Sequence, residues 1–225
     1  MSINNFTGKA EAYVLGRPGY PIAAIDAIKK LIPVDKVIAD IGAGTGKFTV
    51  ELAKLGNSIY AIEPNNDMRK QLTNVLAEYN NVKIIDGMAE ATSIDNNCID
   101  VITIAHALHW FDLNTFGLEC RRILRPGGQI IVIYNHIPGK QLSDRYRQTV
   151  NRFLSCPGIM QFPNQMEYTL EKWLAYIASQ EDYPQPGEKG YEKHMTDIKN
   201  DFIRESKNGL MHIDRLTVVY YETIK

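Results

Sequence analysis

The residues with the clearest chemical potential form a glycine-rich turn. Gly42, Gly44 and Gly46 stand at alternate positions between Asp40 and Lys47, after a short apolar run and before a helical pattern. Glycines leave room for a chain to pass close to a ligand, and free N–H groups at the start of a helix favour an anionic group. Turns of this kind bind phosphates, dinucleotides or other nucleoside cofactors, and the glycine spacing separates these classes.

That spacing argues against two of the classes. A phosphate-binding loop needs G-x-x-x-x-G-K followed by Ser or Thr, and aligning its end with Gly46 and Lys47 leaves Ile41 and Phe48 at the two other required positions. A dinucleotide fingerprint, G-x-G-x-x-G, needs glycine or alanine at Lys47 or glycine at Thr49, depending on where it begins. Neither pattern fits the turn.

A second carboxylate, Glu63, ends the next apolar run, 23 residues after Asp40. Neighbouring parallel strands end at the same edge of a sheet, and an acid at this position accepts hydrogen bonds from ribose hydroxyls in doubly wound folds. Glu63 therefore supports a ribose-bearing cofactor without choosing between a dinucleotide and another nucleoside. The alternate spacing of the glycines argues against the dinucleotide and favours another nucleoside cofactor.

The elements that must position these groups alternate between strand and helix patterns from about residue 20 to residue 135. Apolar runs predict strands at 37–40, 58–62, 82–85, 99–104 and 129–134. Apolar residues at helical spacing predict helices at 23–32, 48–55, 68–79 and 116–124. Such alternation indicates βαβ units, hence a parallel sheet covered on both faces. The predicted fold class is α/β.

The pattern changes after residue 136. Helices are predicted at 141–154 and 170–179, and the apolar residues between Tyr191 and Phe202 fall on one helical face. Residues 181–190 are polar and hold two prolines and two glycines, which indicates an exposed loop. Residues 213–224 are rich in β-branched and aromatic side chains and predict a closing strand.

The motifs resemble those of one enzyme family. The turn at 40–46 reads D-x-G-x-G-x-G and resembles motif I of the class I S-adenosylmethionine-dependent methyltransferases. The sequence at 86–90 is similar to their G-(D/N)-A-E loop, Asp100 to the acid of F-D-x-V, and 125–128 to their L-(K/R)-P-G-G turn. The segments 13–21 and 105–112 resemble the subgroup that includes trans-aconitate-type and other small-molecule methyltransferases.

The resemblance implies a doubly wound, seven-stranded, Rossmann-like sheet with helices on both faces and a helical C-terminal elaboration. It implies S-adenosylmethionine as the cofactor and S-adenosylhomocysteine as the product. Asp40 would serve the cofactor's ammonium group directly or through water, Glu63 its ribose, and Met68 its adenine. The cofactor-binding residues that it implies are Tyr13, Arg17, Tyr20, Asp40, Gly42, Ala43, Gly44, Gly46, Glu63, Pro64, Met68, Met88, Ala89 and Ala105.

Methyl transfer would ask little acid–base chemistry of the protein, because the cofactor's methyl group is already activated. A general base is needed only where the nucleophile is a protonated hydroxyl or amine. His106 and His109 are the candidate catalytic residues, and each could instead satisfy loop hydrogen bonds. Their H-x-x-H spacing does not predict a metal, because no third ligand is placed. The candidate substrate-contacting residues are Trp110, Tyr134 and His136.

Composition limits the classes of partner. The 225 residues carry 25 Lys and Arg against 26 Asp and Glu, so nothing in the charge favours nucleic acid. No run approaches the roughly 20 apolar residues of a membrane helix. The three cysteines, Cys98, Cys120 and Cys156, match no zinc or redox spacing. We therefore expect reduced thiols in a cytoplasmic protein that binds neither nucleic acid nor membrane.

These inferences predict a methyltransferase that acts on a small-molecule acceptor, because the chain has no added recognition domain. We expect one domain, 1–225: an N-terminal lid and first helix at 1–35, a cofactor-binding core at 36–136, a helical acceptor-side region at 137–209 and a closing strand at 210–225. The alternatives are a non-catalytic S-adenosylmethionine-binding protein and, less favoured, an NAD-dependent oxidoreductase. The sequence leaves the acceptor and the oligomeric state open.

Overall fold

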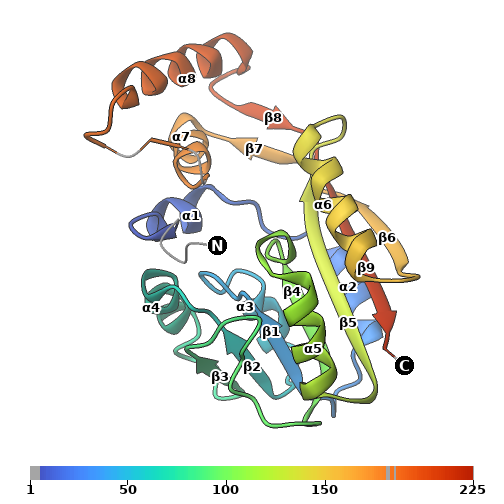
Figure 1. The fold of residues 1–225 in the computed structure, drawn as a ribbon. Helices are drawn as coiled ribbons and strands as arrows, with labels where there is room; N and C mark the ends of the chain where they lie inside the picture. Colours follow the sequence, from blue (N-terminus) through green and yellow to red (C-terminus); the bar gives the residue numbers. More distant parts are fainter. Residues whose placement is uncertain (1–5, 181–182, 185, 225) are drawn as a thin grey trace.

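The computed structural model describes residues 6–180, 183–184 and 186–224. Its main sheet has seven strands in the order β3-β2-β1-β4-β5-β9-β6 and forms the centre of the molecule (Figure 1). The strands β1 to β5 are parallel, whereas β9 is antiparallel to both of its neighbours. The predicted α/β class is confirmed. The strands are β1 Ile38–Ile41, β2 Ile59–Ile62, β3 Val82–Ile85, β4 Ile99–Ala105, β5 Leu124–His136, β6 Gly158–Pro163 and β9 Leu216–Thr223.

Helices cover both faces of this sheet, which is why its central strands are apolar on both sides. The helices α2, α3 and α4 pack on one face, and α5 and α6 pack on the other. All four residues of β1 are buried, including the carboxylate-bearing Asp40. The helices are α1 Ala10–Gly16, α2 Ile22–Leu31, α3 Thr49–Ala53, α4 Asn66–Val75, α5 Leu113–Ile123, α6 Gln141–Phe153, α7 Leu170–Ala178 and α8 Tyr191–Glu205, with a 3₁₀ turn at Leu108–Trp110.

The strand register brings the predicted functional residues to one edge. In β1, Ile41 pairs with Ile62 of β2, and Asp40 pairs with Thr103 of β4. The glycine turn after β1, Glu63 after β2 and the end of β4 therefore meet at the carboxyl edge of the sheet. This is the edge at which open α/β sheets bind their ligands.

A second layer of structure lies over this edge. Figure 1 shows α1, α7 and α8 there, with a two-stranded sheet formed by β7 (Met166–Tyr168) and β8 (Met211–Ile213). Helix α1 approaches α7 very closely, since a Cβ atom added at Gly16 would lie 2.1 Å from the backbone nitrogen of Tyr176. The N-terminal segment and the C-terminal third are therefore packed together above the sheet.

Several of these elements were not predicted. Helix α1, which has only seven residues, was not among the predicted helices. The region 137–209 was predicted as helical, but it also contains the strands β6 and β7. Gly158 and Pro163 stand at the ends of β6 and obscure its strand pattern, although proline is tolerated on an edge strand. The predicted loop at 181–190 falls partly outside the described residues. Within the described ranges, no helix is both long and apolar enough to cross a lipid bilayer.

Candidate active site

Two cavities open at the carboxyl edge of the sheet. The first, of about 450 Å³, lies toward β2 and α4, and the second, of about 350 Å³, lies toward β5, α6 and α7. Both volumes fall within or near the range of roughly 300–1,000 Å³ that is usual for ligand sites. The residues common to both walls are Tyr13, Gly42, Gly44, Ala105 and His106.

The glycine turn forms the boundary between the two cavities. The N–H groups of Gly42 and Ala43 donate to the carbonyl of Ile62, which holds the turn against β2. Gly42 has a φ of +71°, and a Cβ atom there would lie 2.7 Å from the Cβ of Ala107. Gly44 has a φ of +60°, and the space beside it is open. The backbone conformation therefore requires glycine at both positions, and at Gly44 it leaves main chain facing the cavity.

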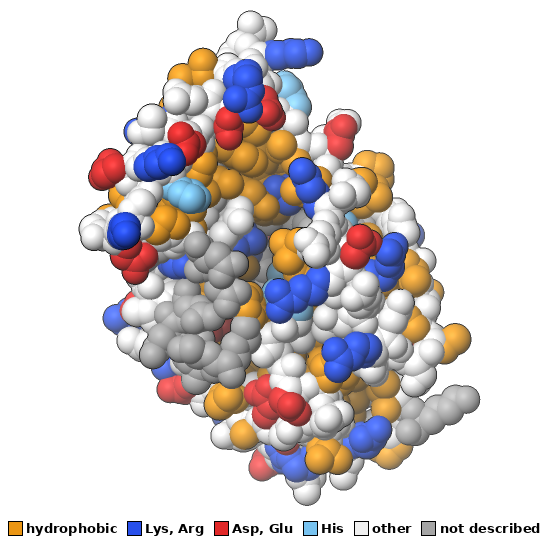
Figure 2. Space-filling model, turned by 45° about the horizontal axis from the view of Figure 1, so that its top comes forward, with side chains coloured by type: hydrophobic (Ala, Val, Ile, Leu, Met, Phe, Trp, Pro, Cys, Tyr) orange, Lys and Arg blue, Asp and Glu red, His pale blue; other side chains and the backbone are white. Residues whose placement is uncertain are grey.

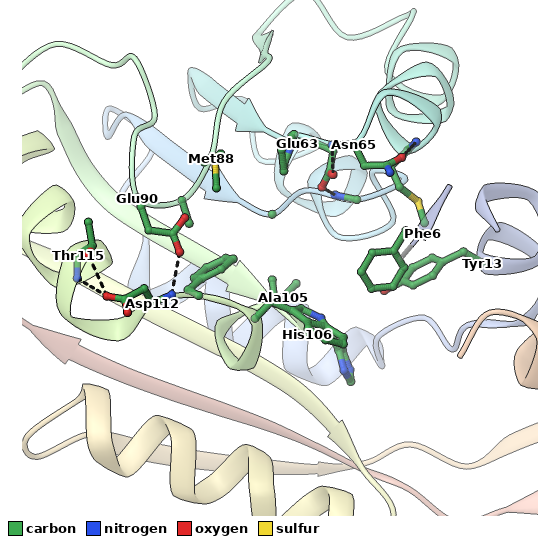
Figure 3. A pocket seen from close by; sticks show the side chains of 18 residues that line it. Phe6, Tyr13, Glu63, Asn65, Met88, Glu90, Ala105, His106, Asp112 and Thr115 are labelled. Atoms are coloured by element: carbon green, nitrogen blue, oxygen red, sulfur yellow. Dashed lines mark hydrogen bonds between the residues drawn. The ribbon is translucent and has the colours of Figure 1, made fainter. Parts of the chain in front are cut away.

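Glu63 stands in the wall of the first cavity, where Figure 3 shows its carboxylate beside Asn65. Its Oε2 accepts from the N–H of Gly44 at 2.8 Å, and its Oε1 accepts from the N–H of Asn65 at 2.8 Å. Burial raises the pKa of Glu63, and these two backbone hydrogen bonds act against that rise. Each oxygen keeps a second lone pair for a ligand hydroxyl.

Asp40 occupies a different position from Glu63. It is 1% exposed and lines neither cavity. Its Oδ2 accepts from the Thr49 hydroxyl at 2.7 Å, and its Oδ1 accepts from the Thr103 hydroxyl at 2.8 Å. Burial raises the pKa of Asp40 to about 6 in spite of these bonds. Because Asp40 is buried and lines neither cavity, a direct contact with a cofactor's ammonium group would require its side chain to move.

The rest of the first cavity is largely apolar. Met68 comes from the first turn of α4, and Met88 and Ala89 come from the loop after β3. Trp110 and Phe111, from the loop after β4, complete this wall, so Trp110 lies in the same cavity as Met88. The predicted adenine-side residues are thus brought together, and the predicted substrate residue Trp110 lies among them.

Helix α1 covers both cavities. Tyr13 lines both, and Arg17 and Tyr20 line the second. The Arg17 Nε donates to the Ser179 hydroxyl at 2.8 Å, which ties the end of α1 to α7. From below, Lys47 Nζ donates to the carbonyl of Arg17 at 2.7 Å. Side chains from three parts of the chain therefore hold α1 in place over the cavities.

His106 has a hydrogen-bond arrangement that bears on its chemistry. The N–H of Asn135 donates to His106 Nε2 at 2.7 Å. An acceptor nitrogen cannot carry the proton, so the neutral ring has its N–H at Nδ1. Burial, followed by the nearby Arg17 charge, holds the pKa of His106 well below its usual value. His106 is therefore a neutral ring whose Nε2 lone pair is already used.

His109 belongs to a cluster of aromatic rings behind the cavity walls. Tyr134 OH lies 3.1 Å from His109 Nδ1 and accepts from the His109 N–H at 3.2 Å. Tyr134 stacks on Tyr146 with ring centroids 4.3 Å apart, and His136 lies beside them. Burial lowers the pKa of His109 to about 3 and that of His136 to about 4.

The structure therefore separates the predicted residues into two sets. Those on a cavity wall are Tyr13, Arg17, Tyr20, Gly42, Ala43, Gly44, Glu63, Pro64, Met68, Met88, Ala89, Ala105, His106 and Trp110. Those on neither wall are Asp40, Gly46, His109, Tyr134 and His136. Among the described residues, no group of three or more His, Cys, Asp or Glu side chains could hold a metal ion.

Sequence reasoning missed most of the second cavity. Its far wall comes from residues that lie between 137 and 215 and carry no motif, such as Tyr146 of α6, Trp173 and Tyr176 of α7, and Arg215 between β8 and β9. Asn65 and Phe6 of the first cavity were also missed. The only available signal for Asn65 was its position as the residue before α4, where its side chain caps two N–H groups.

Comparison with known proteins agrees with this geometry. Residues 39–132 match the family model described as a methyltransferase domain. An uncharacterized methyltransferase of Mycobacterium tuberculosis is 36% identical over 135 residues, which cover 60% of this chain and 53% of that protein. The chain spans about half the length of this relative.

Solved structures extend the likeness of fold over nearly the whole chain. A protein of Anaeromyxobacter dehalogenans assigned as a type II methyltransferase has a TM-score of 0.63 at 18% identity, covering 92% of this chain and 97% of that one. A protein of Anabaena variabilis assigned to an antibiotic biosynthesis pathway has a TM-score of 0.61 at 25% identity, covering 91% and 98%. The family match covers residues 39–132, and the solved structures extend the likeness of fold over nearly the whole chain.

Proposed function

We propose that the chain transfers a methyl group from S-adenosylmethionine to a small-molecule acceptor, with the cofactor in the first cavity and the acceptor in the second. The observation that carries this proposal is the junction of the two cavities, where Gly42, Gly44 and His106 belong to both walls. A ligand that fills the first cavity can therefore present one end to a ligand in the second.

The residues of the first cavity fit this cofactor. Glu63 offers a free lone pair on each oxygen for the two ribose hydroxyls, and Met68, Met88 and Ala89 offer an apolar slot for adenine. The open space beside Gly44 allows the amino-acid part to lie against main-chain atoms. The amino-acid end of the cofactor would cross the junction into the second cavity, where we assign its carboxylate to Arg17 at the end of α1.

When bound, S-adenosylmethionine supplies a methyl group activated by a positively charged sulfur, so a nucleophile can displace a neutral thioether. The protein's part is alignment and exclusion of water. Tyr13 is placed at the junction of the cavities, where the face of its ring can stabilise a positive charge. Helix α1 closes the site from above.

Neither of the two predicted catalytic histidines is placed to act as a general base. His106 Nε2 accepts from Asn135, and His109 lies off both cavity walls. We infer that His106 acts through its Nδ1–H as a hydrogen-bond donor that orients a ligand. A nucleophile that has no proton to lose needs no protein base.

The acceptor is placed among small molecules because the second cavity is enclosed by α1, α6 and α7. We place the protein in the cytoplasm because Cys98, Cys120 and Cys156 are all unpaired.

Calorimetry with S-adenosylmethionine, S-adenosylhomocysteine and NAD tests the proposal. We expect both adenosyl compounds to bind and NAD not to bind. Release of S-adenosylhomocysteine across a panel of small acceptors then separates an enzyme from a non-catalytic cofactor-binding protein. Binding of NAD alone would overturn the proposal, and binding without turnover by any acceptor would leave only its cofactor part standing.

A further inference from the structure

Arg215 is a buried cation in the wall of the second cavity. It lies between β8 and β9 and is 5% exposed. Its Nη2 donates to the Tyr168 hydroxyl at 3.3 Å, and its buried Nε has no hydrogen-bond partner. Among the described side chains, no carboxylate lies within 4.0 Å of its guanidinium nitrogens.

This arrangement is unusual because a buried charge is costly unless it is paired. Two rings offset part of that cost, since the Arg215 guanidinium carbon lies 4.8 Å from the centroid of Tyr176 and 5.9 Å from that of Tyr168. Guanidinium has five N–H donors in a planar fork that matches a carboxylate. Most of these donors find no acceptor in the part of the chain that the structure describes.

The other charges of the second cavity have the same sign. Its described lining includes Arg17, Lys47 and Lys140 besides Arg215, and none of these described lining residues is Asp or Glu. Arg17 and Lys47 already donate to Ser179 and to backbone carbonyls. Figure 2 shows Lys and Arg side chains around the middle of this face of the molecule. A positively charged sulfur at the junction would add to this excess, so an anion in the second cavity would be favoured.

The rest of the lining describes the body of the ligand. Ile137, Leu142, Trp173 and Ile177 present apolar surface in the same cavity as Arg215. A ligand that fills this space would place an apolar body against these side chains and a charged group against the guanidinium. Lys140 of this lining is exposed to solvent, so the buried guanidinium of Arg215 is the charge that an anionic group of the ligand would neutralise.

We propose that Arg215 is a specificity-determining residue that binds the carboxylate of an apolar organic acid, and that such acids are the acceptor class of this enzyme. The statement that these acids accept the methyl group rests on the proposed function, whereas carboxylate binding at Arg215 does not. The cofactor's own carboxylate is the competing occupant. Arg17, which we assign to that carboxylate, also lines the second cavity and lies 5.5 Å from the Tyr176 centroid, but its guanidinium already donates to Ser179. Arg215 Nε has no such partner, and the affinity of the Arg215 variants for S-adenosylhomocysteine separates the two occupants.

The test is calorimetric titration of the full chain saturated with S-adenosylhomocysteine. The probes are benzoate, cinnamate and hexanoate, each beside its neutral amide, together with phenyl phosphate. We expect at least one carboxylate to bind at millimolar concentration and its amide to bind much more weakly. In Arg215→Met we expect the carboxylate affinity to fall about tenfold or more, as for loss of a charged hydrogen bond, and the amide affinity to stay unchanged.

Arg215→Lys keeps the charge and the stem but not the planar fork, so we expect an intermediate loss. If Arg215→Met does not fold, Arg215→Lys still tests whether the carboxylate affinity depends on the guanidinium. Arg204→Met removes an arginine of α8 whose side chain is 66% exposed, and it should bind as the parent protein does. Affinity for S-adenosylhomocysteine should stay within about twofold in all three variants.

Four results would overturn the inference: equal binding of acids and amides, binding of phenyl phosphate without any carboxylate, unchanged carboxylate affinity in both Arg215 variants, or a fall in S-adenosylhomocysteine affinity in place of carboxylate affinity. The last would assign Arg215 to the cofactor. If the parent protein does not bind S-adenosylhomocysteine, the proposed function fails. The same titrations without it would then still decide whether Arg215 holds a carboxylate.

Discussion

Replacing Asp40 by asparagine tests how the first acid of the glycine motif acts. Both of its oxygens accept hydroxyl hydrogen bonds, from Thr49 and Thr103, and no cation of the described chain lies within ion-pair distance of it. Asparagine has the same shape. Its Oδ1 can accept from one threonine and its Nδ2 can donate to the other. Asp40→Asn therefore removes the charge and keeps the packing and the number of hydrogen bonds.

The magnitude follows from the pKa of Asp40, which burial raises from 3.8 to about 6. That difference corresponds to roughly 3 kcal/mol of cost for keeping the buried carboxylate ionised. Below about pH 4 the group is protonated in both states, and there is no cost. Between about pH 4 and 6 the native state keeps the proton that the unfolded state releases, so stability falls as pH rises. Above about pH 6 the cost is constant.

We therefore expect Asp40→Asn to match the parent protein near pH 4 and to exceed its free energy of unfolding by about 1–3 kcal/mol near pH 8. Urea unfolding across this pH range, followed by circular dichroism, measures the difference. Asp35→Asn, at an exposed position, is the matched control and should show no such trend. A stability difference that does not change with pH, or a variant less stable than the parent near pH 8, would refute the reasoning.

Asp40→Asn also tests whether Asp40 reaches the cofactor. Because Asp40 lies off both cavity walls, calorimetry should show that the variant binds S-adenosylhomocysteine with an affinity within a few-fold of the parent's. A hundredfold loss of affinity would show that Asp40 reaches the cofactor.

Three further predictions concern the site. Glu63→Gln leaves one main-chain N–H without an acceptor and removes a charged acceptor from the cavity, so affinity for S-adenosylhomocysteine should fall about 10–100-fold by calorimetry; unchanged affinity would contradict the assignment. Gly16→Ala places a methyl group against the backbone of Tyr176 and should undock α1, with a stability loss of about 1–3 kcal/mol. The control Gly19→Ala adds its methyl group to open space and should change neither thermal unfolding nor ligand affinity. Because the pKa of His106 is held well below its usual value, methyl transfer should show no inflection near pH 6.5, and one that disappears in His106→Asn would restore this residue as a base.

The central strands and the glycine turn could be predicted because their signals are local. Strands β1, β2, β4 and β5 are largely buried on both faces and read as nearly continuous apolar runs between turn residues. Strand β3 lies at the edge of the sheet and is only partly buried, but its apolar run is also local. The positions of Glu63 and the turn at one edge then follow from parallel pairing. The family resemblance implied seven strands, but neither the order of the strands nor the insertion of β9 between β5 and β6 was predicted.

The rest depends on contacts between distant residues. Strand β6 begins at Gly158, against which the ring of Tyr221 lies, and that pairing joins residues 63 positions apart. The direct role assigned to Asp40 did not anticipate the two threonine hydroxyls that occupy it, because one of them belongs to β4. Arg215 follows no motif, and its isolation from any carboxylate is a property of the folded chain alone.

The way in which α1 is held has a consequence for how ligands come and go. Lys47 Nζ donates to the carbonyls of Val14 and Arg17, and the Arg17 side chain donates to Ser179. Helix α1 is therefore bound both to the glycine turn below it and to the end of α7. A ligand cannot leave either cavity past α1 without loosening α7 as well. Exchange of the spent cofactor and admission of the next acceptor should therefore share a single opening event, and a fragment cut back to the strand-rich centre would lose the capacity to retain either one.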